Sequence, residues 1–139
     1  MSRKDGDLIY TVWGDCVPKG RPRFTKRGHA YTPKATRDYA SKVRREVLAE
    51  GAKPQEGALK VSITFTRAYL KSWTKKQRRQ AEAGELHPTT RPDLDNYAKN
   101  ILDALNGVCW NDDAQIVELV LTKRYGEEPK VQIKVEPSN

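Results

Sequence analysis

The sequence predicts one domain of the α+β class, in which a mixed β-sheet carries helices packed on one face. Two stretches, 59–66 and 130–136, alternate polar and apolar residues, which is the pattern of strands with one buried side. Between them, apolar residues from 94 to 108 recur at helical spacing. A chain of 139 residues supports one modest core, so residues 1–139 are expected to form a single domain.

The first half of the chain is predicted to supply a strand, a loop and a helix. Residues 1–6 are polar and are expected to be disordered. Residues 8–13 should form a strand, and residues 18–28, with two prolines, two glycines and five cations, should form a loop. Thr32-Pro33 matches a helix cap followed by proline at the first helical position. That helix should turn five residues inward: Thr36, Tyr39, Ala40, Val43 and Val47.

The basic segment 71–83 is predicted to contain a short helix that is capped by Ser72 and closed by Gly84. Its cations surround too much of the helix for a core element. Two roles are open for it, a solubilising surface insertion or a second element that contacts phosphates. His87 follows in a loop, where a lone histidine is more often a surface residue than a ligand, so it is not predicted to be catalytic.

The back half is predicted to hold one amphipathic helix and two strands. The helix stripe begins at Leu94, and Asn106-Gly107 supplies its stop. Residues 115–125 should form a strand. After a turn, residues 130–136 are expected to pair with it as an antiparallel partner.

The net charge of +8 is distributed unevenly along the chain. Residues 19–45 hold ten Lys or Arg against one acid, and residues 67–79 hold six more and no acid. From residue 103 to the end there are four cations against seven acids. A basic front and an acid-bearing back suggest a polyanion that is bound by one part and acted on by the other. This segregation favours nucleic acid as the partner over a protein with solvated charged faces.

Composition argues against membrane and zinc-binding classes. There is no long apolar run and no apolar N-terminal segment, so neither a membrane span nor a signal peptide is expected. Cys16 and Cys109 lie far apart, without Cys or His neighbours at zinc-ligand spacing. They are expected to be reduced and structural, as in a cytoplasmic protein. Neither a membrane partner nor a small-molecule cofactor is expected.

Acidic residues with a lysine nearby form the candidate site, in the stretch 91–99. Asp93 and Asp95 follow a proline, and in an extended segment their side chains would face the same side. Lys99 lies one helical turn after Asp95 on the same helix face. The pattern therefore places a carboxylate pair at a helix N-terminus, with a cation one turn in.

These residue types suit the hydrolysis of a phosphodiester. The reaction needs charge neutralisation at phosphorus, an activated water and help for the leaving oxygen, and a hard cation held by carboxylates can provide all three. Mg²⁺ is therefore the expected cofactor. Asp112 or Asp113 would complete the set begun by Asp93 and Asp95; strand parity puts the two candidates on opposite faces and leaves the choice open. Lys99 would stabilise charge on the phosphate or the leaving group.

Plainer interpretations exist for the same residues. Helix capping explains one aspartate easily and two with some comfort. An ordinary ion pair between Asp95 and Lys99 would contribute only a few tenths of a kcal/mol. Neither interpretation explains the basic front half.

Several motifs together resemble the RusA family of Holliday junction resolvases. Residues 91–99 read Arg-Pro-Asp-Leu-Asp-Asn-x-x-Lys, and residues 101–107 read Ile-Leu-Asp-Ala-Leu-Asn-Gly. Residues 110–117 follow at the matching separation, as Trp-Asn-Asp-Asp-Ala-Gln-Ile-Val. Residues 18–23 and 31–33 look like the phage and Gram-positive branch of that family.

The resemblance implies a RusA-like, homodimeric, magnesium-dependent endonuclease that cuts four-way DNA junctions. It implies that the catalytic aspartates and metal ligands are Asp93, Asp95 and Asp113. It also implies that Lys99 is the essential lysine. The choice between the last two acids is thus made by the resemblance alone.

Contacts to the DNA backbone are expected from the cations of the 18–28 loop and from the position before the acidic motif. Some family members have a basic residue immediately before the first aspartate, where this chain has Pro92. Phe24 is expected to pin the loop to the core rather than to stack on a base. The residues expected to hold DNA are Lys19, Arg21, Arg23, Lys26, Arg27 and Arg91.

The expected function is the resolution of Holliday junctions by paired strand incisions during DNA recombination and repair. One alternative is a nuclease for other branched or flapped DNA. Another is a DNA-binding protein without catalysis, whose aspartates serve as caps. Two cuts in one complex call for two chains, so a homodimer is expected, paired through the C-terminal hairpin or the central helix.

Overall fold

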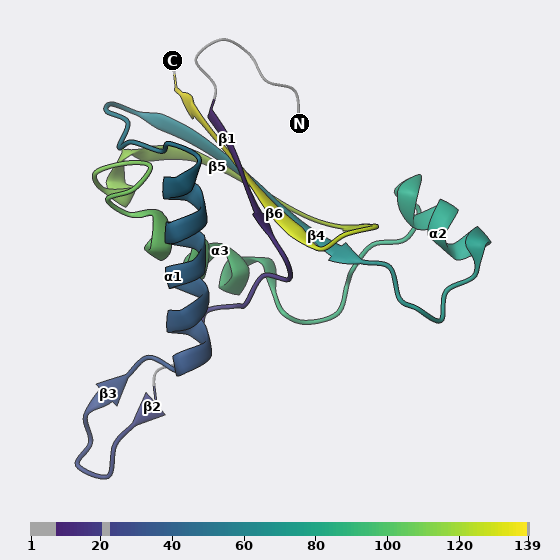
Figure 1. Cartoon of the computed structure of the whole chain (residues 1–139), viewed down its shortest axis with the longest axis horizontal. Helices are drawn as coiled ribbons and strands as arrows, with labels where there is room; N and C mark the ends of the chain where they lie inside the picture. The colour runs from purple at the N-terminus through teal and green to yellow at the C-terminus, as the bar shows by residue number, and fades with distance from the viewer. Residues whose placement is uncertain (1–7, 21–22, 139) are drawn as a thin grey trace.

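A four-stranded mixed sheet forms the centre of the molecule (Figure 1). The structure is a computed structural model that describes residues 8–20 and 23–138. The predicted disorder of residues 1–6 lies outside the described residues. Every helix in the described part is too short or too polar to span a bilayer.

The elements follow one another as strand, hairpin, helix, strand, two helices and two strands. This order confirms the prediction of an α+β domain with a mixed sheet. The elements are β1 (Leu8–Trp13), β2 (Arg23–Phe24), β3 (Ala30–Tyr31), α1 (Lys34–Ala49), β4 (Leu59–Ala68), α2 (Lys75–Glu82), α3 (Leu94–Leu105), the 3-10 turn η1 (Asp113–Gln115), β5 (Ile116–Gly126) and β6 (Lys130–Pro137).

The strands of the sheet lie in the order β1-β6-β4-β5. β4 is parallel to β5 and antiparallel to β6, and β1 is antiparallel to β6. The prediction of an antiparallel pair between 115–125 and 130–136 is wrong, because β4 lies between β5 and β6. Residues 127–129 carry the chain across two strand spacings of about 4.8 Å each, which a nearly extended connection can cover. β5 is thereby left as an edge strand.

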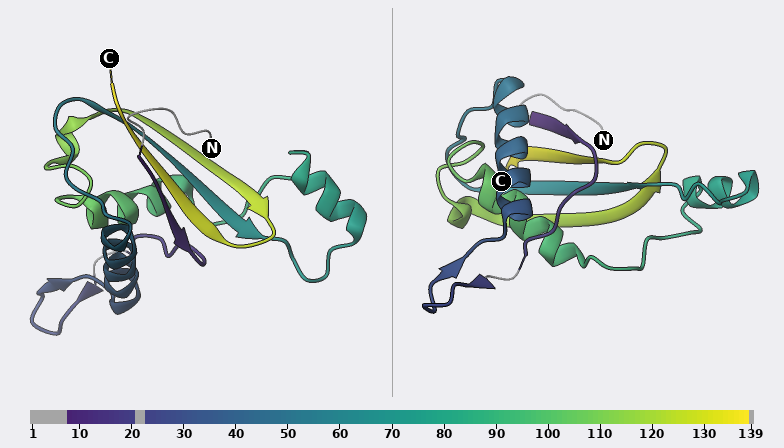
Figure 2. Two further views of the ribbon diagram at one scale, coloured as in Figure 1. Left: turned by 45° about the horizontal axis from the view of Figure 1, so that its top comes forward. Right: turned by 60° about the horizontal axis from the view of Figure 1, so that its bottom comes forward.

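The core lies between the sheet and the helices α1 and α3, which cover one of its faces (Figures 1 and 2). Alternate residues of the central strands point into it, as the period of two predicted. The opposite face carries the polar alternates, among them Lys60, Ser62 and Gln132. The largest buried strand and helix residues include Val61, Ile63, Phe65, Val131, Ile133, Tyr39, Val43, Val47, Ile101 and Leu105.

Helix α2 stands beyond the end of the sheet, away from α1 and α3 (Figure 1). Its cap is Thr74, in a complete capping box, and not Ser72 as predicted. Ala81 is its one buried residue, while Trp73 just before it packs edge-on against Tyr125 of β5, with 4.7 Å between ring centroids. The prediction that this basic segment is not a core helix is confirmed. Of the described helices, α1 and α3 are the ones that pack on a face of the sheet.

Part of the predicted loop 18–28 instead forms an antiparallel hairpin, β2–β3, which projects from the start of α1 (Figure 1). The expectation that Phe24 pins this segment to the core is wrong, because 68% of the residue is exposed. The following helix begins one residue later than predicted, with Pro33 rather than Thr32 at the cap position.

Both cysteines are free thiols. Cys16 is half-buried and Cys109 is buried, which confirms the prediction of reduced, structural residues. Burial raises the pKa of each thiol to about 12. His87 is exposed, as expected for a surface residue.

Candidate functional site

The first turns of α3 are fixed by an aromatic stack beneath them. Tyr97 stacks on Phe65 of β4, with ring centroids 5.1 Å apart and ring planes 21° from parallel. Residues two apart on a helix point about 200° away from each other. Burial of Tyr97 therefore turns Asp95 and Lys99 outward, and both are exposed.

Asp95 and Lys99 line a pocket of about 240 Å³ between α3 and β5. Three parts of the chain supply its walls. Acids from two separate sequence motifs, Asp95 and Asp113, therefore meet at one pocket together with Lys99. The lining residues are Asp95, Ala98, Lys99, Leu102 and Asp103 from α3, Asp113 from η1, and Leu119 and Leu121 from β5.

Asp93 occupies the N-cap position of α3 with extended backbone, but its side chain makes no capping hydrogen bond. Capping therefore does not account for this aspartate. Asp95 lies within the helix, so the extended-segment argument that paired it with Asp93 is wrong. Asp93 is not among the residues that line the pocket, and its part in the site stays a prediction.

Lys99 is not neutralised by Asp95. The i,i+4 ion pairs of the described residues are both on α1, and none joins Asp95 to Lys99. The plainer interpretation of this lysine as an ion-pair partner is therefore not realised in the structure. Lys99 lines the pocket without an ion-pair partner among the described residues, so its charge is available to an anion.

The two acids after α3 take different positions. Asp112 caps η1, because its side chain accepts a hydrogen bond from the backbone N of Ala114 at 2.9 Å within a capping box. Asp113 instead reaches the pocket, and its Oδ1 accepts a hydrogen bond from Nε1 of Trp110 at 2.6 Å. Strand parity does not apply to these two acids, because Asp113 begins a 3-10 turn and β5 begins only at Ile116.

Trp110 is a residue of the site that the sequence reasoning missed. Its ring is fully buried, so Asp113 is held from within the core. A signal was present, because a buried tryptophan usually finds a partner for its N–H, and Asp113 lies three residues further on.

Two cations on the sheet hold the segment that enters α3, and neither was predicted. Lys123 of β5 donates from Nζ to the carbonyl oxygens of Thr90, at 2.9 Å, and Pro92, at 3.0 Å. Arg67 of β4 donates from Nη1 to Oγ1 of Thr90 at 3.3 Å and to the carbonyl oxygen of Arg91 at 3.4 Å. These bonds fix the backbone immediately before the acidic motif. The sequence carries no signal for them, since they join segments more than twenty residues apart.

The donors at this pocket have the chemistry of a magnesium site. Mg²⁺ takes oxygen ligands, and a few carboxylates with several waters suffice. Asp95 is exposed, and Asp113 has a second oxygen besides the one that accepts from Trp110. Across residues 8–20 and 23–138, no three His, Cys, Asp or Glu side chains gather closely enough to hold a metal. The set of three ligands that includes Asp93 therefore stays a prediction.

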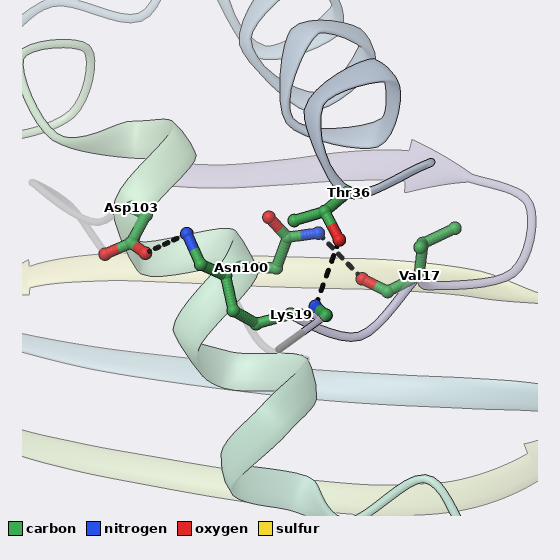
Figure 3. Close-up of polar contacts among 6 residues, drawn as sticks. Val17, Lys19, Thr36, Asn100 and Asp103 are labelled. Atoms are coloured by element: carbon green, nitrogen blue, oxygen red, sulfur yellow. Dashed lines mark hydrogen bonds and ion pairs between the residues drawn. The ribbon is translucent and has the colours of Figure 1, made fainter. Parts of the chain in front are cut away.

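The segment that leads into the basic hairpin is bonded to α3 (Figure 3). The backbone N of Lys19 donates to the carbonyl oxygen of Asn96 at 2.9 Å, and its Nζ pairs with Oδ2 of Asp103 at 3.0 Å. Asn100, which is buried, donates from Nδ2 to the carbonyl oxygen of Val17 at 2.8 Å. The base of the hairpin is thus fixed to the helix that carries the candidate site.

A glycine lets the same segment touch α1. The backbone N of Gly20 donates to Oγ1 of Thr36 at 3.0 Å. A Cβ at this position would lie 2.9 Å from that oxygen and 3.0 Å from Cγ of Pro33, so a side chain would push the segment away. Two helices therefore hold the base of the hairpin.

The cations predicted to bind DNA differ in their surroundings. The ammonium of Lys19 already has a partner in Asp103, and Arg21 lies outside the described residues. DNA contact by any of them stays a prediction. The remaining four are exposed: Arg23, Lys26, Arg27 and Arg91.

A mixed sheet, a pocket that joins two aspartates and a lysine, and a basic hairpin whose preceding segment is bonded to α3 define an α+β protein with an acidic pocket beside a basic surface. The family model for Endodeoxyribonuclease RusA matches residues 14–136, and the chain belongs to this family. It is also similar to the uncharacterized protein YqaN of Bacillus subtilis (strain 168), with 36% identity over 136 residues that cover 92% of this chain and 94% of that protein. The resemblance drawn from the motifs is confirmed.

Proposed function

We propose that this protein is a magnesium-dependent endonuclease that resolves four-way DNA junctions by paired incisions during recombination and repair. The observation that carries the proposal is the pocket in which Asp95, Asp113 and Lys99 meet. Membership of the RusA family supports endonuclease chemistry for that pocket. The basic hairpin, whose preceding segment is bonded to α3, supports a polyanionic substrate.

Each residue of the candidate site would have its own role in hydrolysis of the phosphodiester. Asp93, Asp95 and Asp113 would hold the divalent cation, which when bound neutralises phosphate charge and activates a water. The Trp110 N–H, which donates to Asp113, would hold that carboxylate at the pocket. Lys99 would place its charge where negative charge develops on the phosphate or the leaving oxygen.

Backbone contacts would come from Arg23, Lys26 and Arg27 of the hairpin and from Arg91 beside α3. All four are exposed, and none forms an ion pair within the described residues. Cationic side chains that contact phosphates displace the counterions condensed on the DNA. This release of counterions contributes affinity that does not depend on the DNA sequence.

A homodimer would supply the two sites that paired incisions need. The support comes from β5, an edge strand of 11 residues that pairs only with β4 in the described sheet. Three apolar residues on it are exposed, Val117 at 60%, Leu119 at 41% and Val120 at 47%. A long, apolar, uncovered edge is unusual in a monomer and is suited to pairing with a second copy.

A nicking assay tests the proposal. An immobile four-way junction and a linear duplex of the same arm sequences are incubated with the protein in Mg²⁺ or in EDTA. We expect paired cuts near the branch point, in Mg²⁺ only, and an intact duplex. Cutting of flaps or forks in preference to the four-way junction would transfer the function to other branched DNA. Junction binding without cutting in Mg²⁺ or Mn²⁺ would leave a binding protein without catalysis.

A further inference from the structure

Phe24 is the most exposed of the large apolar side chains in the described structure, with 68% of the residue accessible. It lies on β2, opposite Ala30 in the register of the hairpin. The small partner leaves one side of the ring uncovered. Arg23 faces Tyr31 instead, and Tyr31 is itself 47% exposed.

The hairpin closes its turn without help from this ring. The backbone N of Thr25 donates to the carbonyl oxygen of His29, and the N of Gly28 donates to the carbonyl oxygen of Thr25, both at 2.9 Å. Gly28 has φ of +81°, which the turn requires and which glycine adopts freely. The core of the described residues does not include Phe24. The ring therefore has no structural task that would explain an aromatic residue here.

Three cations surround the ring in sequence and are exposed with it, namely Arg23, Lys26 and Arg27. Cations that track a phosphate backbone bring an adjacent aromatic ring within reach of the bases. Alternation of cations and exposed aromatic rings is the usual arrangement for stacking on unpaired bases. Bases inside a continuous duplex are already stacked on their neighbours and offer no free face.

The segment before the hairpin is held on α3, because Val17 bonds to Asn100 and Lys19 pairs with Asp103 (Figure 3). The backbone N of Lys19 also donates to the carbonyl oxygen of Asn96. A base that stacks on Phe24 would therefore belong to the same DNA molecule that reaches the pocket on α3. In four-way DNA, bases with a free face occur at the branch point. A ring on a hairpin that adjoins both α1 and the segment bonded to α3 would couple recognition of the branch to the position of the cut.

We propose that Phe24 stacks on an unstacked nucleobase at the branch point, so that the hairpin 23–31 distinguishes branched DNA from linear duplex. This inference rests on the proposed function, since it takes branched DNA as the substrate of the pocket. The ligand of Phe24 would be the face of a nucleobase, and the cations of the hairpin would supply the accompanying phosphate contacts.

The test measures binding in EDTA, so that catalysis does not enter. Dissociation constants are determined for an immobile four-way junction and for a linear duplex, with wild type, Phe24→Ala, Phe24→Trp and Leu48→Ala. Leu48 on α1 is a matched control, because it is apolar and 51% exposed but lies off the hairpin. In parallel, 2-aminopurine is placed at the branch point or in the middle of an arm, and its fluorescence is recorded on binding.

We expect Phe24→Ala to weaken junction binding about 5- to 150-fold, the range for loss of one base–aromatic stack, and to change duplex binding less than about twofold. Phe24→Trp should restore the preference, and Leu48→Ala should keep it. The wild type, but not Phe24→Ala, should change the fluorescence of the branch-point probe. Equal weakening of both substrates, or no weakening of either, would overturn the proposal.

Failure of this proposal is separable from failure of the proposed function. A wild type that cuts junctions in Mg²⁺ while Phe24→Ala binds and discriminates normally would retain the nuclease and remove the stacking role. A wild type that binds junction and duplex equally and cuts neither would overturn both.

Discussion

The indole N–H of Trp110 lies 2.6 Å from Oδ1 of Asp113, and the ring that donates it is fully buried. The third acid of the candidate site is therefore oriented by the core rather than by the surface. A hydrogen bond to a charged group from a rigid buried donor fixes the carboxylate more firmly than solvent would. The side chain of Asp112, one residue earlier, instead caps η1 by accepting a hydrogen bond from the backbone N of Ala114.

Lys99→Ala is expected to lower the rate of the chemical step by about 10²- to 10³-fold, with little change in junction affinity. Its partner charge would develop in the transition state, and removal of one such donor costs that much in rate. Single-turnover cleavage at saturating Mg²⁺ measures the effect. Lys34→Ala is the matched control, because Lys34 is an exposed lysine on α1 that pairs with Asp38.

The alternative for Lys99 is a role in binding. Recovery of the full rate by excess Mg²⁺ or excess protein would show that the lysine acts on affinity and not on the chemical step.

Binding should be chiefly electrostatic. The logarithm of affinity should fall with the logarithm of salt concentration by about 0.9 per phosphate contacted. Combined replacement of Arg23, Lys26 and Arg27 by alanine should flatten this slope by roughly one unit per lost contact. Lys60→Ala, on the polar face of the sheet, should leave the slope unchanged. An unchanged slope in the triple variant would remove the hairpin from the binding surface.

The thiols of Cys16 and Cys109 should be slow to react in the folded protein. With a pKa of about 12, only about one thiol in 10⁴ is ionised at pH 8, against about one in ten for an ordinary cysteine. Iodoacetamide should label both residues readily in guanidinium chloride and neither at a comparable rate without it. Rapid labelling of the native protein would contradict the buried environment described for them.

The raised pKa values of the two thiols also make the free energy of unfolding depend on pH. The unfolded thiols lose protons from about pH 9, whereas the folded thiols keep theirs until about pH 12. The free energy of unfolding should therefore fall as pH rises between those values.

The periodic parts of the fold could be predicted from the sequence. The alternation of β4, the stripe of α3 and the alternation of β6 each repeat over enough residues for the period to identify the element. Strand pairing could not be predicted in the same way. Adjacent strands in sequence were assigned to each other, but β4 inserts between β5 and β6, and only the assembled core decides that order. Two-residue strands such as β2 and β3 are too short to show any period.

The site residues that could be predicted are those that residue type and spacing alone identify. Asp95 and Lys99 were identified from an i,i+4 pattern, and the structure brings both to one pocket. The choice of Asp113 over Asp112 could not be made from the residues, because it depends on a 3-10 turn and on the reach of Trp110. The tethering of the acidic loop by Lys123 depends on the parallel register of β5 and was equally hidden.

Mixed dimers test the paired-site mechanism. A dimer with one wild-type chain and one Asp95→Asn chain should nick one strand of a junction but rarely complete resolution within a binding event. Two cuts need two pockets, and the mixed dimer has only one that holds its full set of carboxylates. A cruciform plasmid, which is nicked by one cut and linearised by two, gives the readout. Mixed dimers that linearise the plasmid as well as wild type would contradict the mechanism.

A charged residue on the exposed edge strand β5 tests the proposed dimer interface. Val120→Lys places a cation in the middle of β5 and should convert the dimer to a monomer in sedimentation. Leu48→Lys, on the exposed side of α1, should leave the dimer intact.

We propose above all that Asp113, and not Asp112, joins Asp95 and Lys99 in a catalytic pocket. Single-turnover cleavage of a four-way junction by Asp113→Asn and Asp112→Asn tests it most directly. Asparagine caps a helix as well as aspartate does, so Asp112→Asn should keep the turn and cut within about twofold of wild type. Asp113→Asn should cut at least about 10³-fold more slowly while binding the junction as well or better, since it loses a metal ligand and a negative charge near DNA. Normal cutting by Asp113→Asn together with inactive Asp112→Asn would contradict the account.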